Sequence, residues 1–140
     1  MSAAVPTTIL VVDDDRAIRT LVQGLLEREG YKTLVADSAE EALALFPEHQ
    51  ESVALLVTDM VMAGIQGTEL ARQLQRIKPN LPVLVVSACR GQFDEALEGF
   101  PCLSKPFTIR ELVGRVGELL PQRKGTAREK VGKERKLKSG

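Results

Sequence analysis

The sequence predicts a doubly wound α/β domain in which five parallel strands alternate with helices. Two observations support this fold class. Short runs of consecutive apolar residues recur along the chain, and such runs are typical of parallel strands that helices cover on both faces. Segments with helical spacing of apolar residues, or with helix-capping residues, stand between these runs. This alternation favours an open parallel sheet.

Each strand is expected where an apolar, β-branched run lies between turn residues. The expected strands are residues 8–12, 32–36, 53–58, 83–87 and 101–104. The expected helices are residues 15–29, a helix from Ser38 through about Phe46, residues 68–77, a short helix at 92–98, and a last helix from Thr108 to Leu120. Ser38 with Glu41 is a predicted capping box, as is Thr108 with Glu111. Pro47 is expected to stop the second helix.

Charge is distributed unevenly, although the formal net charge of the 140 residues is zero. Residues 121–140 contain eight Lys or Arg and two Glu, a net of +6, so the rest of the chain has a net of −6. The basic segment lacks apolar periodicity, which is typical of disorder. Its charge could attract nucleic acid, an acidic partner or an anionic membrane. Because it lacks aromatic residues for base stacking, a solvated tail or linker is favoured over a nucleic-acid partner. We predict an N-terminal extension at 1–7, one domain at 8–120 and a basic disordered tail at 121–140.

The sequence favours a cytoplasmic protein. Its two cysteines, Cys89 and Cys102, match no zinc-binding spacing and are predicted to be reduced thiols. The first residues lack the basic start and apolar stretch of a signal peptide. No apolar run approaches the roughly 20 residues that a membrane-spanning helix needs.

Three carboxylates follow two of the predicted strands. Asp13 and Asp14 come after the first strand, and Asp59 comes after the third. Ligands of open parallel sheets bind at the carboxyl ends of the strands, and neighbouring carboxylates repel unless a cation lies between them. Mg²⁺ suits such oxygen ligands. We expect Asp14, Asp59 and the backbone carbonyl of Val61 to bind Mg²⁺ directly, with Asp13 bound directly or through water.

A hydroxyl and an ammonium group complete the expected site. Ser87 ends the fourth strand, and Lys105 follows the fifth. A carboxylate can accept a phosphoryl group, and Asp59 is the predicted acceptor. Lys105 is expected to bind one phosphoryl oxygen and Ser87 to donate a hydrogen bond to another. Asp15 is expected to be a helix N-cap instead.

Four segments around these residues resemble the signatures of bacterial response-regulator receiver domains. The segments are Val11-Val12-Asp13-Asp14-Asp15, Val57-Thr58-Asp59-Met60-Val61-Met62-Ala63-Gly64, Val86-Ser87-Ala88 and Ser104-Lys105-Pro106-Phe107. The resemblance covers about residues 8–120. It implies a flavodoxin-like receiver fold with a five-stranded parallel sheet in the order 2-1-3-4-5.

The resemblance also implies roles for the site residues. Asp59 would be phosphorylated by a phosphohistidine on a partner, and Asp13 and Asp14 would form the acidic pocket. Ser87 would be the switch hydroxyl. Lys105 would bind phosphate and precede a cis proline, which a Lys-Pro bond permits.

By this resemblance the protein is a phosphorylatable switch of a two-component system or phosphorelay, not a classical enzyme. A histidine kinase or histidine phosphotransfer protein would be the donor. With no output domain expected, the protein would act by binding a downstream protein or by passing the phosphoryl group onward, as a monomer or weak dimer. Val61 and Cys89 would flank the route of the attacking water and orient it weakly, which predicts slow loss of the phosphoryl group.

The sequence departs from the family in three ways. Ala63 stands where Pro is usual, and Cys102 stands where Phe or Tyr often precedes the lysine. The stretch between Ser87 and Lys105 is about one helical turn short. We therefore expect the fourth helix to be abbreviated or replaced by a loop, as in receivers of hybrid histidine kinases.

Two other functions remain open from the residues alone. One is a binding scaffold that is never phosphorylated, although the full set of site residues argues against it. The other is a haloacid-dehalogenase-type phosphatase, whose Asp-x-Asp spacing Asp13 and Asp15 share. The chain lacks the cap insertion and the late acidic pair of such enzymes, and Asp59 would have no role in one.

Overall fold

A computed structural model describes residues 7–88 and 99–120 and shows one five-stranded parallel sheet in the order β2-β1-β3-β4-β5. The predicted fold class and strand order are confirmed. The strands are β1 Thr8–Val12, β2 Lys32–Ala36, β3 Val53–Asp59, β4 Val83–Ser87 and β5 Cys102–Ser104. The helices are α1 Arg16–Arg28, α2 Ala39–His49, α3 Gly67–Ile77 and α4 Ile109–Leu119.

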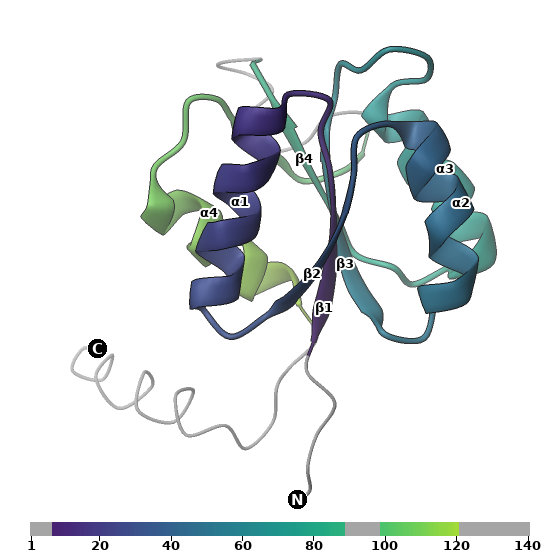
Figure 1. The fold of residues 1–140 in the computed structure, drawn as a ribbon, viewed down its shortest axis with the longest axis horizontal. Helices are drawn as coiled ribbons and strands as arrows, with labels where there is room; N and C mark the ends of the chain where they lie inside the picture. The colour runs from purple at the N-terminus through teal and green to yellow at the C-terminus, as the bar shows by residue number, and fades with distance from the viewer. Residues whose placement is uncertain (1–6, 89–98, 121–140) are drawn as a thin grey trace, which may run out of the picture.

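Helices cover both faces of the sheet (Figure 1): α1 and α4 lie on one side, and α2 and α3 lie on the other. The two faces of β1 show why. Leu10 and Val12 belong to the apolar cluster that contains Phe46 of α2, whereas Ile9 and Val11 belong to the cluster that contains Leu112 of α4. Successive strand residues point to opposite faces, so an unbroken apolar run is buried on both sides.

The two cores hold the carboxyl ends of the central strands in fixed positions. Phe46 and Leu112 are fully buried, and burying side chains of this size contributes about 1.5–3 kcal/mol each. No helix in the described part of the chain is both long and apolar enough to cross a membrane.

The second helix corrects one prediction. Pro47 was expected to stop it, but α2 continues through Pro47 to His49. A proline within a helix lacks only its own N–H donor and clashes with the carbonyl four residues earlier. Because only Glu48 and His49 follow Pro47 in α2, a kink at the proline would displace only the final two residues of the helix.

Side-chain caps start α1, α2 and α4 much as predicted, whereas α3 starts without one. Asp15 caps α1 by accepting hydrogen bonds from the N–H groups of Ala17 and Ile18. The box of Thr108 and Glu111 forms in both directions at α4. The other box forms only in part, because Ser38 accepts from Glu41 N–H whereas the Glu41 carboxylate accepts from Asp37 N–H. The Glu41 carboxylate thus bonds the N–H of Asp37 instead of the N–H of Ser38, which a full capping box would use.

Several predictions fall outside the described residues. These are the short helix at 92–98, the shortened fourth helix, Cys89 and the basic tail at 121–140.

Candidate functional site

The carboxyl ends of β1, β3, β4 and β5 bring the predicted site residues to one rim of the sheet. Asp13 directly follows β1, and Asp59 is the last residue of β3. Asp59 pairs with Val86 in the register of β3 and β4, so Ser87 lies one residue farther along. Lys105 follows β5, and its backbone N–H donates to the carbonyl of Ser87 over 2.7 Å.

Lys105 contacts two of the three acids directly. Its Nζ lies 3.2 Å from Asp59 Oδ1 and 3.6 Å from Asp13 Oδ2. The peptide bond between Lys105 and Pro106 is cis, as the resemblance implied. Lys105 follows β5 at the edge of the sheet. Its ammonium group extends past the end of β4 to the carboxylate that follows β1 and the one that ends β3.

Asp13, Asp14 and Asp59 form the acidic cluster. Each offers a carboxylate oxygen, and the three oxygens lie within 4.8 Å of one another. Asp13 and Asp59 are buried, whereas Asp14 is exposed. An all-oxygen donor set that is partly open to water fits Mg²⁺, which keeps several waters when bound to protein.

The environment of Asp59 disfavours its negative charge. Burial raises the pKa of Asp59 above its ordinary value, and the nearby charge of Asp13 raises this pKa further. Lys105 acts in the opposite direction, by its charge and by its hydrogen bond. The pKa of Asp59 is raised overall, because burial and the negative charge of the neighbouring acids together exceed the effect of the one ammonium group. A bound cation would therefore relieve an unfavourable charge.

Ser87 and Val61 occupy different surroundings at the rim. Ser87 is buried at the end of β4, whereas the Val61 residue is 70% exposed in the loop after β3. Because the predicted contribution of Val61 is its backbone carbonyl, the exposed side chain does not conflict with that role.

Gly67 has a role that the sequence did not reveal. The helix was expected to start at residue 68, but Gly67 begins α3 and lies directly against Asp59. A Cβ atom at this position would collide with the backbone carbonyl oxygen of Asp59. Gly67 N–H also donates to Met60 O over 2.8 Å. Only glycine lets α3 start so close to the end of β3.

Thr58 is a second residue that the predictions missed. It is fully buried, and its hydroxyl donates to the Asp59 carbonyl over 2.9 Å. Polar residues at the end of an apolar strand often cap it, so nothing in the sequence distinguished this threonine.

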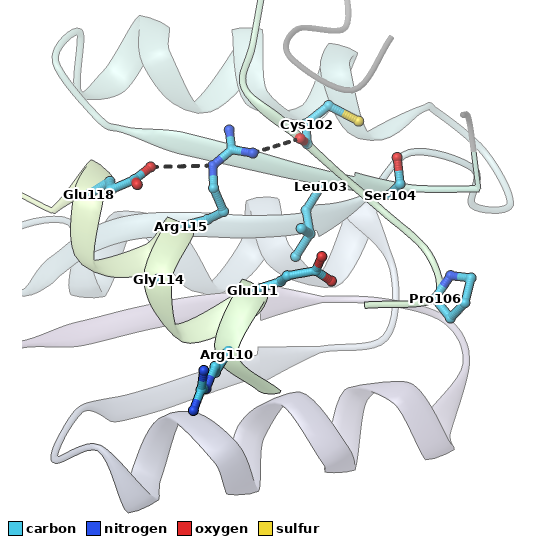
Figure 2. Close-up of a pocket in the computed structure, with 9 residues that line it drawn as sticks. All are labelled: Cys102, Leu103, Ser104, Pro106, Arg110, Glu111, Gly114, Arg115 and Glu118. Carbon is cyan, nitrogen blue, oxygen red and sulfur yellow. Dashed lines mark hydrogen bonds and ion pairs between the residues drawn. The ribbon is translucent and has the colours of Figure 1, made fainter. Parts of the chain in front are cut away.

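A separate pocket of about 450 Å³ lies between β5 and α4 (Figure 2). Arg115 extends from α4 across it, donating to the Cys102 carbonyl over 3.1 Å and lying 3.5 Å from a Glu118 carboxylate oxygen. Ser104 and Pro106, the two neighbours of Lys105, line the pocket, but none of the three acids does. The acidic cluster at the rim and this pocket are therefore separate features of the molecule.

Comparison with protein families matches residues 9–117 to the response regulator receiver domain. The chain belongs to the response regulator receiver family. The receiver is 34% identical over 120 residues to the phosphate regulon transcriptional regulatory protein PhoB of Pseudomonas aeruginosa, a match that covers 81% of this chain and 51% of PhoB. The chain therefore spans about half the length of the curated relatives it matches.

Solved receiver structures are similar in fold and sequence. The receiver domain of the hybrid histidine kinase CckA is 32% identical, with a TM-score of 0.71, and the match covers 81% of this chain and 99% of that one. The response regulator TrrA of Thermotoga maritima, solved with Mg²⁺ and a beryllium fluoride, is also 32% identical, with a TM-score of 0.69 and the same coverage.

Membership of this family bears on the two alternatives that the sequence left open. Nothing supports the scaffold, and the phosphatase interpretation fails because the family match includes Asp59. The geometry agrees, since the Asp15 carboxylate caps α1 and is not paired with Asp13 as an Asp-x-Asp enzyme would need.

Proposed function

We propose that this receiver accepts a phosphoryl group on Asp59 and that the modification changes which partners it binds. The observation that supports this most strongly is the 3.2 Å contact between Lys105 Nζ and Asp59 Oδ1. A lysine held against a carboxylate with a raised pKa can stabilise the charge of a phosphoryl group built on that carboxylate.

The transfer step needs little from the protein except positioning. An Asp59 carboxylate oxygen attacks the phosphorus of a phosphohistidine, and the new O–P bond forms as the P–N bond breaks. The imidazole leaves and takes up a proton. Lys105 stabilises one phosphoryl oxygen, and the Ser87 hydroxyl donates to another. The added charge of about −1.5 to −2 then biases the arrangement of the residues around Asp59.

The acidic cluster would hold Mg²⁺ through Asp14 and Asp59, with Asp13 contributing directly or through water and Val61 through its backbone carbonyl. The mutual approach of the three carboxylates and the metal bound by the similar protein TrrA support this assignment. When bound, the ion neutralises carboxylate and phosphoryl charge.

The wider biology follows from the same proposal. The donor is a histidine kinase or histidine phosphotransfer protein, and the protein acts in the cytoplasm as a monomer or weak dimer. The receiver proper is residues 8–120. It promotes its own phosphorylation and slow dephosphorylation but transforms no external substrate.

Phosphorylation by a small donor tests the proposal. The chain is incubated with Mg²⁺ and phosphoramidate, and its intact mass is measured. The natural protein should gain one phosphoryl group, and Asp59→Asn should gain none. Asp37→Asn is a matched control because Asp37 is an exposed carboxylate just after β2. It should be phosphorylated normally, and equal labelling of the Asp59→Asn protein would contradict the assignment.

A further inference from the structure

Arg19 connects α1 to the acidic loop in a way that the chemistry above does not use. Its Nη1 donates to the backbone carbonyl of Asp13 over 2.8 Å, six residues back along the chain. Arg19 itself is only partly exposed. The bond therefore closes the loop between β1 and the first turns of α1 (Figure 1).

The other polar groups of Asp13 are also held. Its N–H donates to Ala36 O over 3.2 Å, and its Oδ1 accepts from Asp15 N–H over 2.8 Å. Its Oδ2 faces Lys105 at 3.6 Å. With the Arg19 bond to its carbonyl, every polar group of Asp13 has a partner. Asp13 is thus fixed from four directions.

Asp14 is held differently. Its side chain is exposed, so its orientation depends on the main chain on either side. The Asp13 carbonyl belongs to the peptide unit that leads into Asp14, and that unit is the one Arg19 holds. Fixing the peptide plane restricts where the Asp14 carboxylate can lie.

We propose that Arg19 is a positioning residue that sets the Asp13–Asp14 peptide and thereby orients Asp14 toward the metal. This inference rests on the proposed function, since it assumes that the acidic cluster binds a divalent cation. Partners that orient metal ligands often matter for affinity nearly as much as the ligands themselves.

Because Arg19 is positively charged, the two possible roles predict opposite changes in Mg²⁺ affinity when it is removed. A cation beside an acidic site repels a second cation, so electrostatics alone predict that removing Arg19 would strengthen Mg²⁺ binding. A positioning role predicts the opposite, because the loss of the hydrogen bond frees the Asp14 peptide.

Arg16 provides a matched control. It lies on the same helix, one turn nearer its start, and is exposed. Within the described residues its side chain makes no hydrogen bond or ion pair. Arg16→Ala therefore removes a nearby positive charge without removing a loop contact.

The experiment measures the dissociation constant of Mg²⁺ for the unphosphorylated protein by NMR titration of backbone amides. Arg19→Ala should weaken binding about tenfold, in the range typical of residues that orient metal ligands. Arg16→Ala should leave affinity unchanged or slightly tighter. Arg19→Lys keeps the charge and a donor and should restore much of the affinity. Melting in EDTA checks each fold, and Arg19→Met, which keeps most of the side-chain length but has no hydrogen-bond donor, replaces the alanine variant if that protein is unfolded.

Each result decides a different point. Unchanged or tighter Mg²⁺ binding by folded Arg19→Ala or Arg19→Met overturns the positioning role but leaves the metal site intact. Equal weakening by Arg16→Ala also overturns it, because the effect would then not depend on the hydrogen bond. Absence of Mg²⁺ binding by the natural protein would refute the metal site itself, and this inference with it.

Discussion

Lys105 Nζ lies between two carboxylates, 3.2 Å from Asp59 Oδ1 and 3.6 Å from Asp13 Oδ2. This arrangement joins the edge strand β5 to the two central strands. Under the proposed function, this one ammonium group would offset the charge of the acids before phosphorylation and would stabilise the phosphoryl group afterwards.

Lys105→Met should slow phosphorylation of Asp59 by small donors. Loss of a single donor that stabilises transition-state charge commonly costs about 100-fold in rate, and at least a tenfold loss is expected here. The measurement is the rate of mass gain at fixed phosphoramidate and Mg²⁺. Lys32→Met, which alters an exposed lysine of β2, is the control. An unchanged rate in Lys105→Met would remove the lysine from the mechanism.

Asp59→Asn should stabilise the metal-free protein at neutral pH. The pKa of Asp59 is raised in the fold, so the folded protein binds a proton more readily than the unfolded chain. Protonated Asp59 therefore favours the folded state at low pH, and this contribution to stability is lost as the pH rises through the pKa of Asp59 in the folded protein. Ionised Asp59 destabilises the fold, and asparagine removes the charge while keeping the shape.

Urea denaturation in EDTA at several pH values checks this expectation. The advantage of Asp59→Asn should be largest at neutral pH and should shrink as the pH falls toward 3.8, the ordinary pKa of the group. Mg²⁺ should stabilise the natural protein more than the variant. An asparagine variant less stable than the natural protein at neutral pH would mean that the Lys105 ion pair outweighs desolvation.

Gly67→Ala should damage both stability and phosphorylation. The added methyl group meets the Asp59 backbone carbonyl, which cannot move without shifting the end of β3. Overpacking of this kind costs about 1–3 kcal/mol. Gly24→Ala is the control, because Gly24 lies in α1 with open space around it and should gain about 0.5–1 kcal/mol. Thermal melts and phosphorylation rates of both variants test the contrast, and two equally stable variants would contradict it.

The phosphorylated receiver should lose its phosphoryl group slowly. Val61, whose side chain is apolar and 70% exposed beside the site, cannot orient an attacking water. Phosphorylated protein freed of donor should keep most of its label over minutes, as followed by intact mass. Replacing Val61 with Glu or Gln should speed the decay, and loss of label within seconds in the natural protein would refute the expectation.

The sequence predicted the strands well because each central strand is buried on both faces and therefore reads as an unbroken apolar run. The polar residue at the end of each run then located the site. Pro47 was misjudged because the local rule for proline takes no account of how few residues of α2 follow it.

Gly67, Thr58 and Arg19 were missed for a shared physical reason. Each contacts a backbone carbonyl of Asp13 or Asp59, and main-chain groups leave no pattern in a sequence. The predicted metal ligands and Lys105 could be found from their side-chain types. The contacts that hold the Asp13 and Asp59 backbones depend on how closely α1 and α3 approach the strand ends. Only coordinates show that approach.

Borohydride trapping tests the central claim most directly, because it converts an aspartyl phosphate into homoserine at the modified position. The phosphorylated protein is reduced, digested and sequenced by mass spectrometry. The account predicts homoserine at position 59 and unmodified aspartate at 13 and 14. Homoserine at position 13 or 14, or none at all in protein shown to carry a phosphoryl group, would contradict it.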